Sequence, residues 1–309
     1  MKRFRIANLV WAARRIPVRW ELDPIIAAWP PLELRYYTLL FGCGLWLAWR
    51  AGRRCFPRFE LPPGDALPVL LWSSVGMLVG AHYLHLAFYE PHGFSDLRFG
   101  WDEERQSWVI GRFWNLGSGL ASHGGALGAI AGLYLFWRWK KKPSGISFWR
   151  YADASILASV WVYPFVRLGN FFNSELVGRP SNLPWAVVFA RYDAIPRHPV
   201  QLYEAILYSF EIVLAEWLAQ RRFASLPEGV CFGGILSLHF TLRFVCEFFK
   251  EAQGVDQGWS LTMGQWLSFP MVFGGGGVAF LRWLMEKEKS AAHKYRLSEE
   301  KNEAGYHRH

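Results

Sequence analysis

A series of apolar runs long enough to cross a lipid bilayer constrains this chain more than any other feature. A transmembrane helix needs about 20 mostly apolar residues to span a hydrocarbon core of roughly 30 Å. Tryptophan and tyrosine gather near the ends of these runs, as they do in the interfacial belts of membrane proteins. The runs predict an all-α integral membrane protein with seven transmembrane helices. The expected spans are 34–51, 66–88, 119–139, 149–165, 199–218, 229–249 and 262–285.

The composition supports a membrane protein and argues against a nucleic-acid partner. Charged residues make up only 19% of the chain, whereas soluble domains average about 25%. Lysine and arginine number 34 against 25 acidic residues, but cytoplasmic loops of membrane proteins carry such an excess beside anionic lipid. The chain has no basic helix or RNP-like string, so we expect it to contact membrane lipid and no nucleic acid.

The histidines and cysteines do not form a metal-ligand pattern. None of the four cysteines belongs to a Cys-x-x-Cys pair, so neither a zinc site nor a disulfide framework is indicated. His82 and His85 can share one helical face, but no His-Glu-x-x-His string or carboxylate cluster completes a ligand set. We therefore expect neither a metal nor a cofactor.

The charges divide the chain into three parts and orient it. We expect an N-terminal interfacial arm (1–33), a transmembrane domain (34–285) and a charged cytoplasmic tail (286–309). The loops after the first, third and fifth spans are rich in lysine and arginine, which marks them as cytoplasmic. The loops between spans two and three and between spans four and five then form a small extracytoplasmic cap. The basic arm, which this orientation places outside, conflicts with the rule.

Seven crossings bring the unusual polar residues to the same, extracytoplasmic ends of the spans. Ionisable groups inside a membrane are costly and usually face a wet cavity where they serve function. Scattered structural residues would not sort to one face, so the pattern predicts a single site. Its members are Tyr37, His123, Arg167, Asn170, Arg197, His198, Glu204, Arg243, Glu247 and Gln265.

Two long polar strings and three shorter ones carry a resemblance to a known family. The long strings are Arg167-Leu-Gly-Asn-Phe-Phe-Asn-Ser-Glu175, followed by Gly178-Arg179, and Arg197-His-Pro-Val-Gln-Leu-Tyr-Glu204. The shorter ones are Ser122-His-Gly-Gly125, Arg243-Phe with Glu247-Phe, and Met263-Gly-Gln265. In this order they resemble the bacterial phosphatidylglycerol–prolipoprotein diacylglyceryl transferases, from about Asp23 to the last span.

The chain departs from that family's pattern at four positions. Val166 and Thr38 stand where the family usually has glycine. His82 replaces a common arginine, and His239 replaces a frequent tyrosine. The two histidines leave open any proton role at their positions.

The resemblance implies a transferase of the bacterial inner membrane with its active site on the extracytoplasmic side. Its substrates would be phosphatidylglycerol and a prolipoprotein whose signal peptide carries a lipobox cysteine. The thiol would attack the diacylglyceryl group, forming a thioether and releasing glycerol phosphate. This chemistry needs a thiolate, and free thiols have a pKa of about 8.5. It also needs stabilisation of the charge that gathers on the departing phosphate.

Roles follow for the residues that match the family's strings. Arg167 and Arg243 would clamp the phosphate, because a guanidinium fork binds it bidentately, and His123 would act as a base or orient the head group. Phosphatidylglycerol would also contact Tyr37, Asn170, Glu175 and Gly178. Supporting or peptide-facing roles fall to Asn173, Arg197, His198, Gln201, Tyr203, Glu204, His239, Glu247 and Gln265.

Structural roles stay open for some of these residues. Glu175 could be the partner of an arginine, Tyr37 a member of the interfacial belt, and Arg197 with His198 a brace for the outer loop. Structural pairing is the better interpretation of Asp153, whose partner the sequence does not name. For the whole chain, the alternative is a transporter of lipid or small solutes. Transporters tend to carry internal repeats, and this chain has none.

Overall fold

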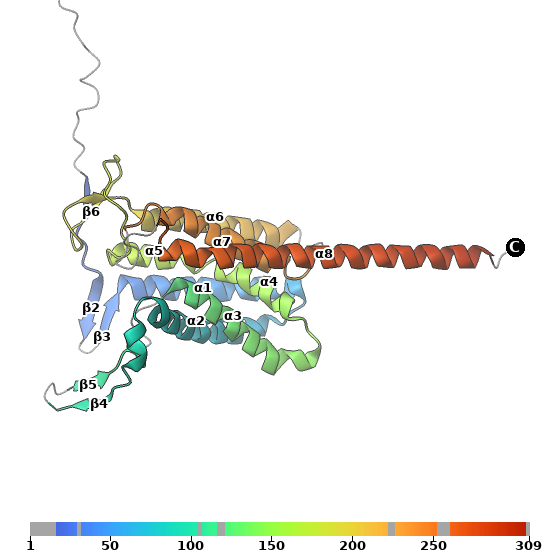
Figure 1. The fold of residues 1–309 in the computed structure, drawn as a ribbon, viewed down its shortest axis with the longest axis horizontal. Coiled ribbons are helices and arrows are strands. Elements are labelled where there is room, and N and C mark those ends of the chain that lie inside the picture. Colours follow the sequence, from blue (N-terminus) through green and yellow to red (C-terminus); the bar gives the residue numbers. More distant parts are fainter. Residues whose placement is uncertain are drawn as a thin grey trace, which may run out of the picture.

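The computed structural model describes residues 17–29, 32–103, 107–115, 121–221, 226–251 and 260–306. Within these ranges the chain is mostly helical, with a bundle whose long helices run side by side (Figure 1). The described α-helices are α1 (Tyr36–Cys55), α2 (Ala66–Phe88), α3 (Ser122–Phe136), α4 (Phe148–Ser159), α5 (Tyr163–Phe172), α6 (Val200–Arg221), α7 (Val230–Glu247) and α8 (Met263–Tyr306). Shorter helical turns are η2 (Phe56–Phe59), η3 (Pro63–Asp65), η4 (Pro91–Ser95), η5 (Trp137–Lys141) and η6 (Lys142–Ser144).

Three helical segments in the described ranges are long and apolar enough to cross a membrane by themselves. They are Pro63–Phe88, Val230–Glu247 and Met263–Leu297. Less than one fifth of the apolar window is buried inside the bundle in the first and last of these, so their apolar side chains face outward. A surface of this kind is stable in lipid and not in water.

The segment expected as the fourth span is two helices. The α-helix breaks at residues 160–162, between α4 and α5. Pro164 is the second residue of α5, and a proline ring clashes with the carbonyl group four residues earlier, here that of Val160. The expected end at 165 is therefore wrong, because α5 continues to Phe172 and carries Arg167 and Asn170 within it.

Short strands at one end of the bundle correct the all-α expectation. The strands β1 (Val18–Trp20), β6 (Val187–Phe189) and β7 (Pro196–Arg197) form one sheet, in the order β1-β6-β7. Two hairpins pair β2 (Ile25–Trp29) with β3 (Leu32–Arg35), and β4 (Phe99–Asp102) with β5 (Ser107–Ile110). The arm expected only to lie at the interface thus contributes strands, and β1 runs parallel to β6 with Val18 opposite Val187. Residues 1–16 of that arm lie outside the described residues.

Glycines let α2 and α3 approach until their backbones touch. A Cβ atom on Gly128 would lie 2.0 Å from the carbonyl oxygen of Gly76, and one on Gly124 would lie 2.3 Å from that of Gly80. Any larger residue at these positions would force the helices apart. This close packing fixes the N-terminal end of α3, where His123 lies.

Helix α8 extends far beyond the bundle. It runs 44 residues from Met263 to Tyr306, about 66 Å at the rise of an α-helix, and its charged half projects away from the end that carries the strands (Figure 1). The expected boundary at 285/286 therefore falls inside one helix. Residues 307–309 lie outside the described residues.

Asp153 on α4 finds its partners in the backbone of α7. One carboxylate oxygen accepts the N–H of Gly229 at 2.7 Å and the other accepts the N–H of Phe232 at 2.7 Å. The first N–H groups of a helix have no partner within the helix, and a carboxylate there also opposes the helix dipole favourably. The structural interpretation of Asp153 fits this geometry, with backbone amides in place of a charged side chain.

Asp153→Ala should destabilise the protein by about 2 kcal/mol, the upper range for loss of a helix cap. Reversible unfolding in mixed micelles would measure this change in the free energy of unfolding. Asp153→Asn keeps one acceptor oxygen and should recover about half of the loss. Equal stability of the alanine variant and the parent protein would contradict a capping role.

Candidate active site

A fully buried carboxylate lies at the centre of the polar cluster. Glu204, in the first turns of α6, has 0% of its surface exposed. Its oxygens lie 3.2 Å from Arg167 Nε, 2.9 Å from Lys250 Nζ and 3.8 Å from Arg243 Nη1. The Arg167 N–H is not aligned with Glu204 Oε2, which has no hydrogen-bond partner in the described part, so this contact is an ion pair only. Burying a carboxylate requires such compensation.

A second carboxylate, that of Glu247, lies beside the cations but does not balance their charge. Glu247, in the last turn of α7, lies 3.0 Å from Lys250 Nζ and 3.8 Å from Arg243 Nη2. Three cations (those of Arg167, Arg243 and Lys250) therefore face two carboxylates. These five side chains together carry one net positive charge at neutral pH, which favours an anionic ligand beside the arginines.

Arg243 is the least satisfied of the three cations. Both of its ion-pair contacts are 3.8 Å long, and its buried Nε has no hydrogen-bond partner among the described residues. A buried donor left without a partner costs about 1–3 kcal/mol. An oxyanion placed beside this guanidinium would remove that cost.

A chain of hydrogen bonds links Arg167 to the loop that follows α5. Arg167 Nη1 donates to Asn170 Oδ1 at 3.3 Å, and Asn170 Nδ2 donates to Glu175 Oε2 at 3.2 Å. Asn173 Nδ2 donates to Glu175 Oε1 at 3.0 Å, while Gln201 Nε2 donates to the Glu175 carbonyl group at 2.6 Å. Glu175 thus binds side-chain amides, and the expected alternative of an arginine partner is not what its described bonds show.

Tyr37, at the start of α1, packs directly on the backbone of α5. A Cβ atom on Gly169 would lie 2.5 Å from the Tyr37 ring, so only glycine leaves room for this contact. The ring lies on the helix that carries Arg167 and Asn170. Tyr37 is therefore part of the cluster, beyond any membership of the interfacial belt.

His123 reaches the same region from α3, and its hydrogen bonds fix the tautomer. Its Nε2 lies 3.2 Å from Ser268 Oγ, and that hydroxyl group donates its proton to the Gly264 carbonyl group at 2.7 Å. Because the hydroxyl proton is already used, His123 Nε2 must be the donor, and Nδ1 keeps the lone pair. A Cβ atom on Gly264 would lie 2.6 Å from Glu247 Oε1, which joins His123 to the charged cluster through α8.

Gln265 closes the N-terminal end of α8. Its Oε1 accepts the N–H of Thr262 at 3.0 Å, and Thr262 Oγ1 accepts the N–H of Gln265 at 3.2 Å. This reciprocal pair is a capping box. Gln265 thereby holds Gly264 and Ser268 in register with Glu247 and His123.

Arg197 and its neighbours brace the loop over the cluster. Arg197 Nη1 donates to the Gly178 carbonyl group at 3.0 Å and to Glu251 Oε2 at 2.6 Å. Its Nε donates to Asp193, and these bonds hold the pKa of the Asp193 carboxyl group below its usual range. A Cβ atom on Gly178 would lie 2.4 Å from the His198 carbonyl oxygen. The geometry favours the loop-holding interpretation of Arg197 over direct contact with a peptide.

His198 belongs to a separate network at the same end. The hydroxyl group of Tyr203 accepts from Trp185 Nε1 at 2.7 Å and lies 3.2 Å from His198 Nδ1. Since the hydroxyl group accepts from the indole, its own proton can go to His198. Trp185 is about half exposed, so this network reaches the surface of the protein.

Glu204→Gln should lower the free energy of unfolding by about 3 kcal/mol, because it leaves buried cations without their carboxylate. Unfolding in mixed micelles measures the change. Glu251→Gln is the matched control: Glu251 is 38% exposed in its pair with Arg197, and such pairs contribute about 0–1 kcal/mol. Equal losses from the two variants would contradict the central position of Glu204.

Comparisons with known proteins agree with this arrangement. A family model described as prolipoprotein diacylglyceryl transferase matches residues 24–281. The chain belongs to the prolipoprotein diacylglyceryl transferase family. The resemblance and the transferase class expected from the sequence are confirmed, and the transporter alternative is not supported.

Relatives in several bacteria share this family. A phosphatidylglycerol–prolipoprotein diacylglyceryl transferase of Tolumonas auensis is 36% identical over 272 residues, covering 88% of this chain and 98% of the relative. Proteins of the same name in Chloroherpeton thalassium and Bacteroides fragilis are 35% and 33% identical. The matches cover 83% and 84% of this chain, and 91% and 93% of the relatives.

His239, which stands where this transferase family often has tyrosine, has a buried partner. Its Nδ1 lies 2.9 Å from Glu211 Oε2, and Glu211 is fully buried. The imidazole ring lies between Tyr163 and Tyr208, with ring centroids 4.2 and 4.6 Å away. His82, the other departure, lies on α2 with Nε2 at 3.3 Å from the Phe113 carbonyl oxygen. Both substituted histidines thus have a polar partner nearby, Glu211 for His239 and the Phe113 carbonyl group for His82.

Two members of the cluster, Lys250 and Ser268, and a neighbouring carboxylate, Glu211, were missed at the sequence level. Glu211 follows Glu204 by seven residues, two helical turns, so it lies on the same face of α6, and this spacing could have revealed it. Lys250 directly follows the apolar run expected to end at 249. Ser268 carries no sequence signal, because a serine inside a membrane helix usually bonds its own backbone.

Proposed function

We propose that this chain transfers the diacylglyceryl group of phosphatidylglycerol to the lipobox cysteine thiol of a prolipoprotein. The observation that carries the site assignment is the buried Arg243 guanidinium, whose Nε lacks a partner in the described part. Membership of the transferase family supports the reaction, and the excess of Arg167, Arg243 and Lys250 over Glu204 and Glu247 supports an anionic substrate.

The reaction is a displacement at a saturated carbon atom. The cysteine sulfur forms a bond to the glyceryl carbon while the bond from that carbon to the phosphate oxygen breaks. The electron pair of the broken bond stays on the departing glycerol phosphate, and the thiol proton is released to a base. Stabilisation of the growing phosphate charge by fixed donors is typically the largest catalytic contribution.

Arg167 and Arg243 are suited to different parts of this task. Arg167 is held by Glu204 and by Asn170 Oδ1, so its side chain is already oriented before substrate binds. Arg243 has an N–H donor without a partner in the described part, and its guanidinium group would bind the phosphate oxygens. Tyr37, Asn170, Glu175 and Gly178 would shape the pocket for the glycerol head group, on the loop held by Arg197.

His123 is the proposed base. Its Nε2 donates to Ser268, which leaves the Nδ1 lone pair to accept the thiol proton. The second role that the sequence allows, orientation of the head group, uses the same lone pair as a hydrogen-bond acceptor for a glycerol hydroxyl group. The pH dependence of a His123→Gln variant separates the two roles.

For the membrane topology we propose seven crossings, with α4 and α5 together forming the fourth. The cluster and the strands would then lie on the extracytoplasmic side of the bacterial inner membrane, where β4, β5, β6 and β7 form the cap. Arg53 and Arg54 in the last turn of α1, and the lysines of 140–142 after α3, lie at the opposite helix ends. The positive-inside rule assigns those ends, and the α8 extension beyond 286, to the cytoplasm.

The proposed function is tested with purified protein in vesicles that contain phosphatidylglycerol and a lipobox peptide. We expect thioether formation on the peptide together with release of an equal amount of glycerol phosphate. The same peptide with serine in place of cysteine should release none. Release that does not depend on the cysteine would indicate a lipid hydrolase and contradict the transfer.

A further inference from the structure

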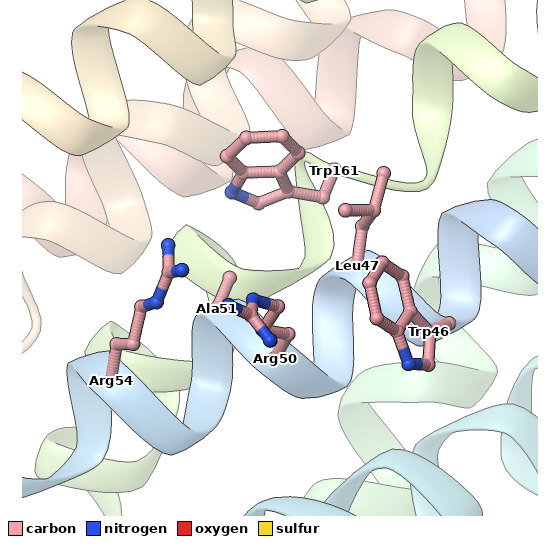
Figure 2. A pocket seen from close by; sticks show the side chains of 6 residues that line it. All are labelled: Trp46, Leu47, Arg50, Ala51, Arg54 and Trp161. Carbon is pink, nitrogen blue, oxygen red and sulfur yellow. The ribbon is translucent and has the colours of Figure 1, made fainter.

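A cavity of about 320 Å³ opens between α1 and the break that separates α4 from α5. Figure 2 shows its walls, in which two guanidinium groups of α1 lie below the ring of Trp161. The lining residues are Trp46, Leu47, Arg50, Ala51, Arg54 and Trp161. The lining includes two cations and no carboxylate.

This cavity is far from the transferase site. Tyr37 marks the site end of α1, and the helical rise places Arg50 and Arg54 about 20 and 26 Å further along the axis. The hydrocarbon core of a bilayer is roughly 30 Å thick. The cavity therefore lies near the membrane surface opposite to the one at which the transferase cluster opens.

The two arginines are free to bind a ligand. Arg50 and Arg54 are one helical turn apart and exposed, and neither forms an ion pair within the described part of the chain. The Arg50 guanidinium lies over the Trp46 ring, 5.7 Å from its centroid. Two guanidinium groups on one face of a helix can donate hydrogen bonds to the same phosphate group from two sides.

Trp161 supplies a third donor. Its indole Nε1 is buried and has no hydrogen-bond partner among the described residues. In Figure 2 this nitrogen is at the side of the ring that faces Arg54. An unpaired buried N–H is unfavourable by about 1–3 kcal/mol, and an oxygen of a ligand in the cavity would satisfy it.

A second cavity of about 150 Å³ shares Ala51 and Arg54 with the first. It contains Glu216, whose carboxylate disfavours an anion there. The anion is therefore placed in the first cavity, between the two arginines and Trp161.

We propose that this cavity binds the phosphate group of an anionic glycerophospholipid from the leaflet opposite to the active site. Arg50 and Arg54 bind the phosphate oxygens, and the Trp161 indole donates to an ester oxygen. The exposed ring of Trp46 and the side chain of Leu47 contact the first methylene groups of the acyl chains. The general attraction of basic residues to an anionic surface is about 1 kcal/mol each, and the cavity adds a preference for a defined headgroup position.

The test measures lipid binding to the full-length protein in an uncharged detergent by native mass spectrometry. Phosphatidic acid is the probe, and phosphatidylcholine with the same acyl chains, whose zwitterionic headgroup has no net charge, is its control. We expect Arg54→Gln and Trp161→Phe each to weaken phosphatidic acid binding about tenfold. The first variant loses a charge-assisted hydrogen bond and the second loses a buried one, and each loss has about this effect. Arg53→Gln is the matched control, because Arg53 stacks on Trp49 from the same helical turn and lies outside the cavity. It should bind as the parent protein does.

Several outcomes would overturn the proposal. Equal weakening by Arg53→Gln would show that only the net charge of α1 matters. Equal binding of phosphatidylcholine would show that the headgroup charge is not recognised. Inorganic phosphate or glycerol phosphate that displaces the lipid at equal concentration would indicate a soluble ligand. Loss of binding in Arg243→Gln would assign the bound lipid to the transferase site.

Discussion

Arg243→Lys should reduce the rate of thioether formation by about 10²–10³-fold, the usual cost of removing a donor to a developing oxyanion. Lysine keeps the positive charge, so the ion pairs with Glu204 and Glu247 can re-form. It offers a single ammonium group, however, where the guanidinium offers a planar fork that binds two phosphate oxygens at once. The rate should be measured with saturating phosphatidylglycerol in vesicles and a lipobox peptide, so that the loss appears in turnover.

A second arginine distinguishes a catalytic loss from a general sensitivity of buried arginines. The Arg197 side chain is more buried than that of Arg243 (6% against 11% exposed) and binds two carboxylates, but it holds the loop between α5 and α6. Arg197→Lys should therefore lower thermal stability and reduce turnover by less than about tenfold, since it perturbs support rather than the reacting atoms. A near-normal rate for Arg243→Lys would remove Arg243 from the phosphate clamp.

The helices and the site members were predictable from different signals. Long apolar runs predict membrane helices because bilayer thickness sets their length. Successive membrane spans run in opposite directions, and this rule predicted that polar residues of distant spans lie at one end of the bundle. The residues come from α1, α3, α5, α6, α7 and α8. Tyr37 beside Gly169, and Arg167 beside Glu204, are contacts between residues far apart in sequence that this rule places together.

Three features of the fold were not predictable from the sequence, because they depend on backbone geometry and on backbone partners that any residue can supply. The break before α5 follows from Pro164, but a proline inside an apolar run can also be tolerated as a kink. The partners of Asp153 are backbone N–H groups, which every residue carries, so no side chain in the sequence could name them. The strands β1, β2 and β3 are short, and their pairing, β1 with β6 and β2 with β3, decides them rather than intrinsic preference.

The role of each charged residue also needed three-dimensional geometry. Glu204 and Arg197 belong to the same sequence string, yet one lies at the centre of the cluster and the other braces a loop. Their residue types alone suit both tasks. The contact of Glu204 with Lys250 and that of Arg197 with Asp193 distinguish the two roles. Both partners lie outside the string.

His123→Gln should reduce turnover by about 10²–10⁴-fold if the imidazole removes the thiol proton, the range of general-base contributions. Glutamine can still donate to Ser268 and keeps a polar acceptor, so packing at α8 should be preserved. Ser268→Ala provides the companion variant: it removes the partner of Nε2 while leaving the base in place. It should lose activity to a smaller extent than His123→Gln does.

The pH dependence of the glutamine variant separates proton transfer from orientation. Without a base the reaction relies on thiolate formed in solution, and the thiolate fraction rises about tenfold per pH unit below the thiol pKa of about 8.5. The rate of His123→Gln should therefore climb about tenfold per pH unit between pH 6 and about 8, which narrows its deficit relative to the parent protein by up to about 100-fold. A loss below tenfold that stays constant across this range would contradict the base, because such a deficit reflects binding geometry. His123 would then be the group that orients the glycerol hydroxyl groups, and the electropositive cluster of Arg167, Arg243 and Lys250 would lower the thiol pKa on its own.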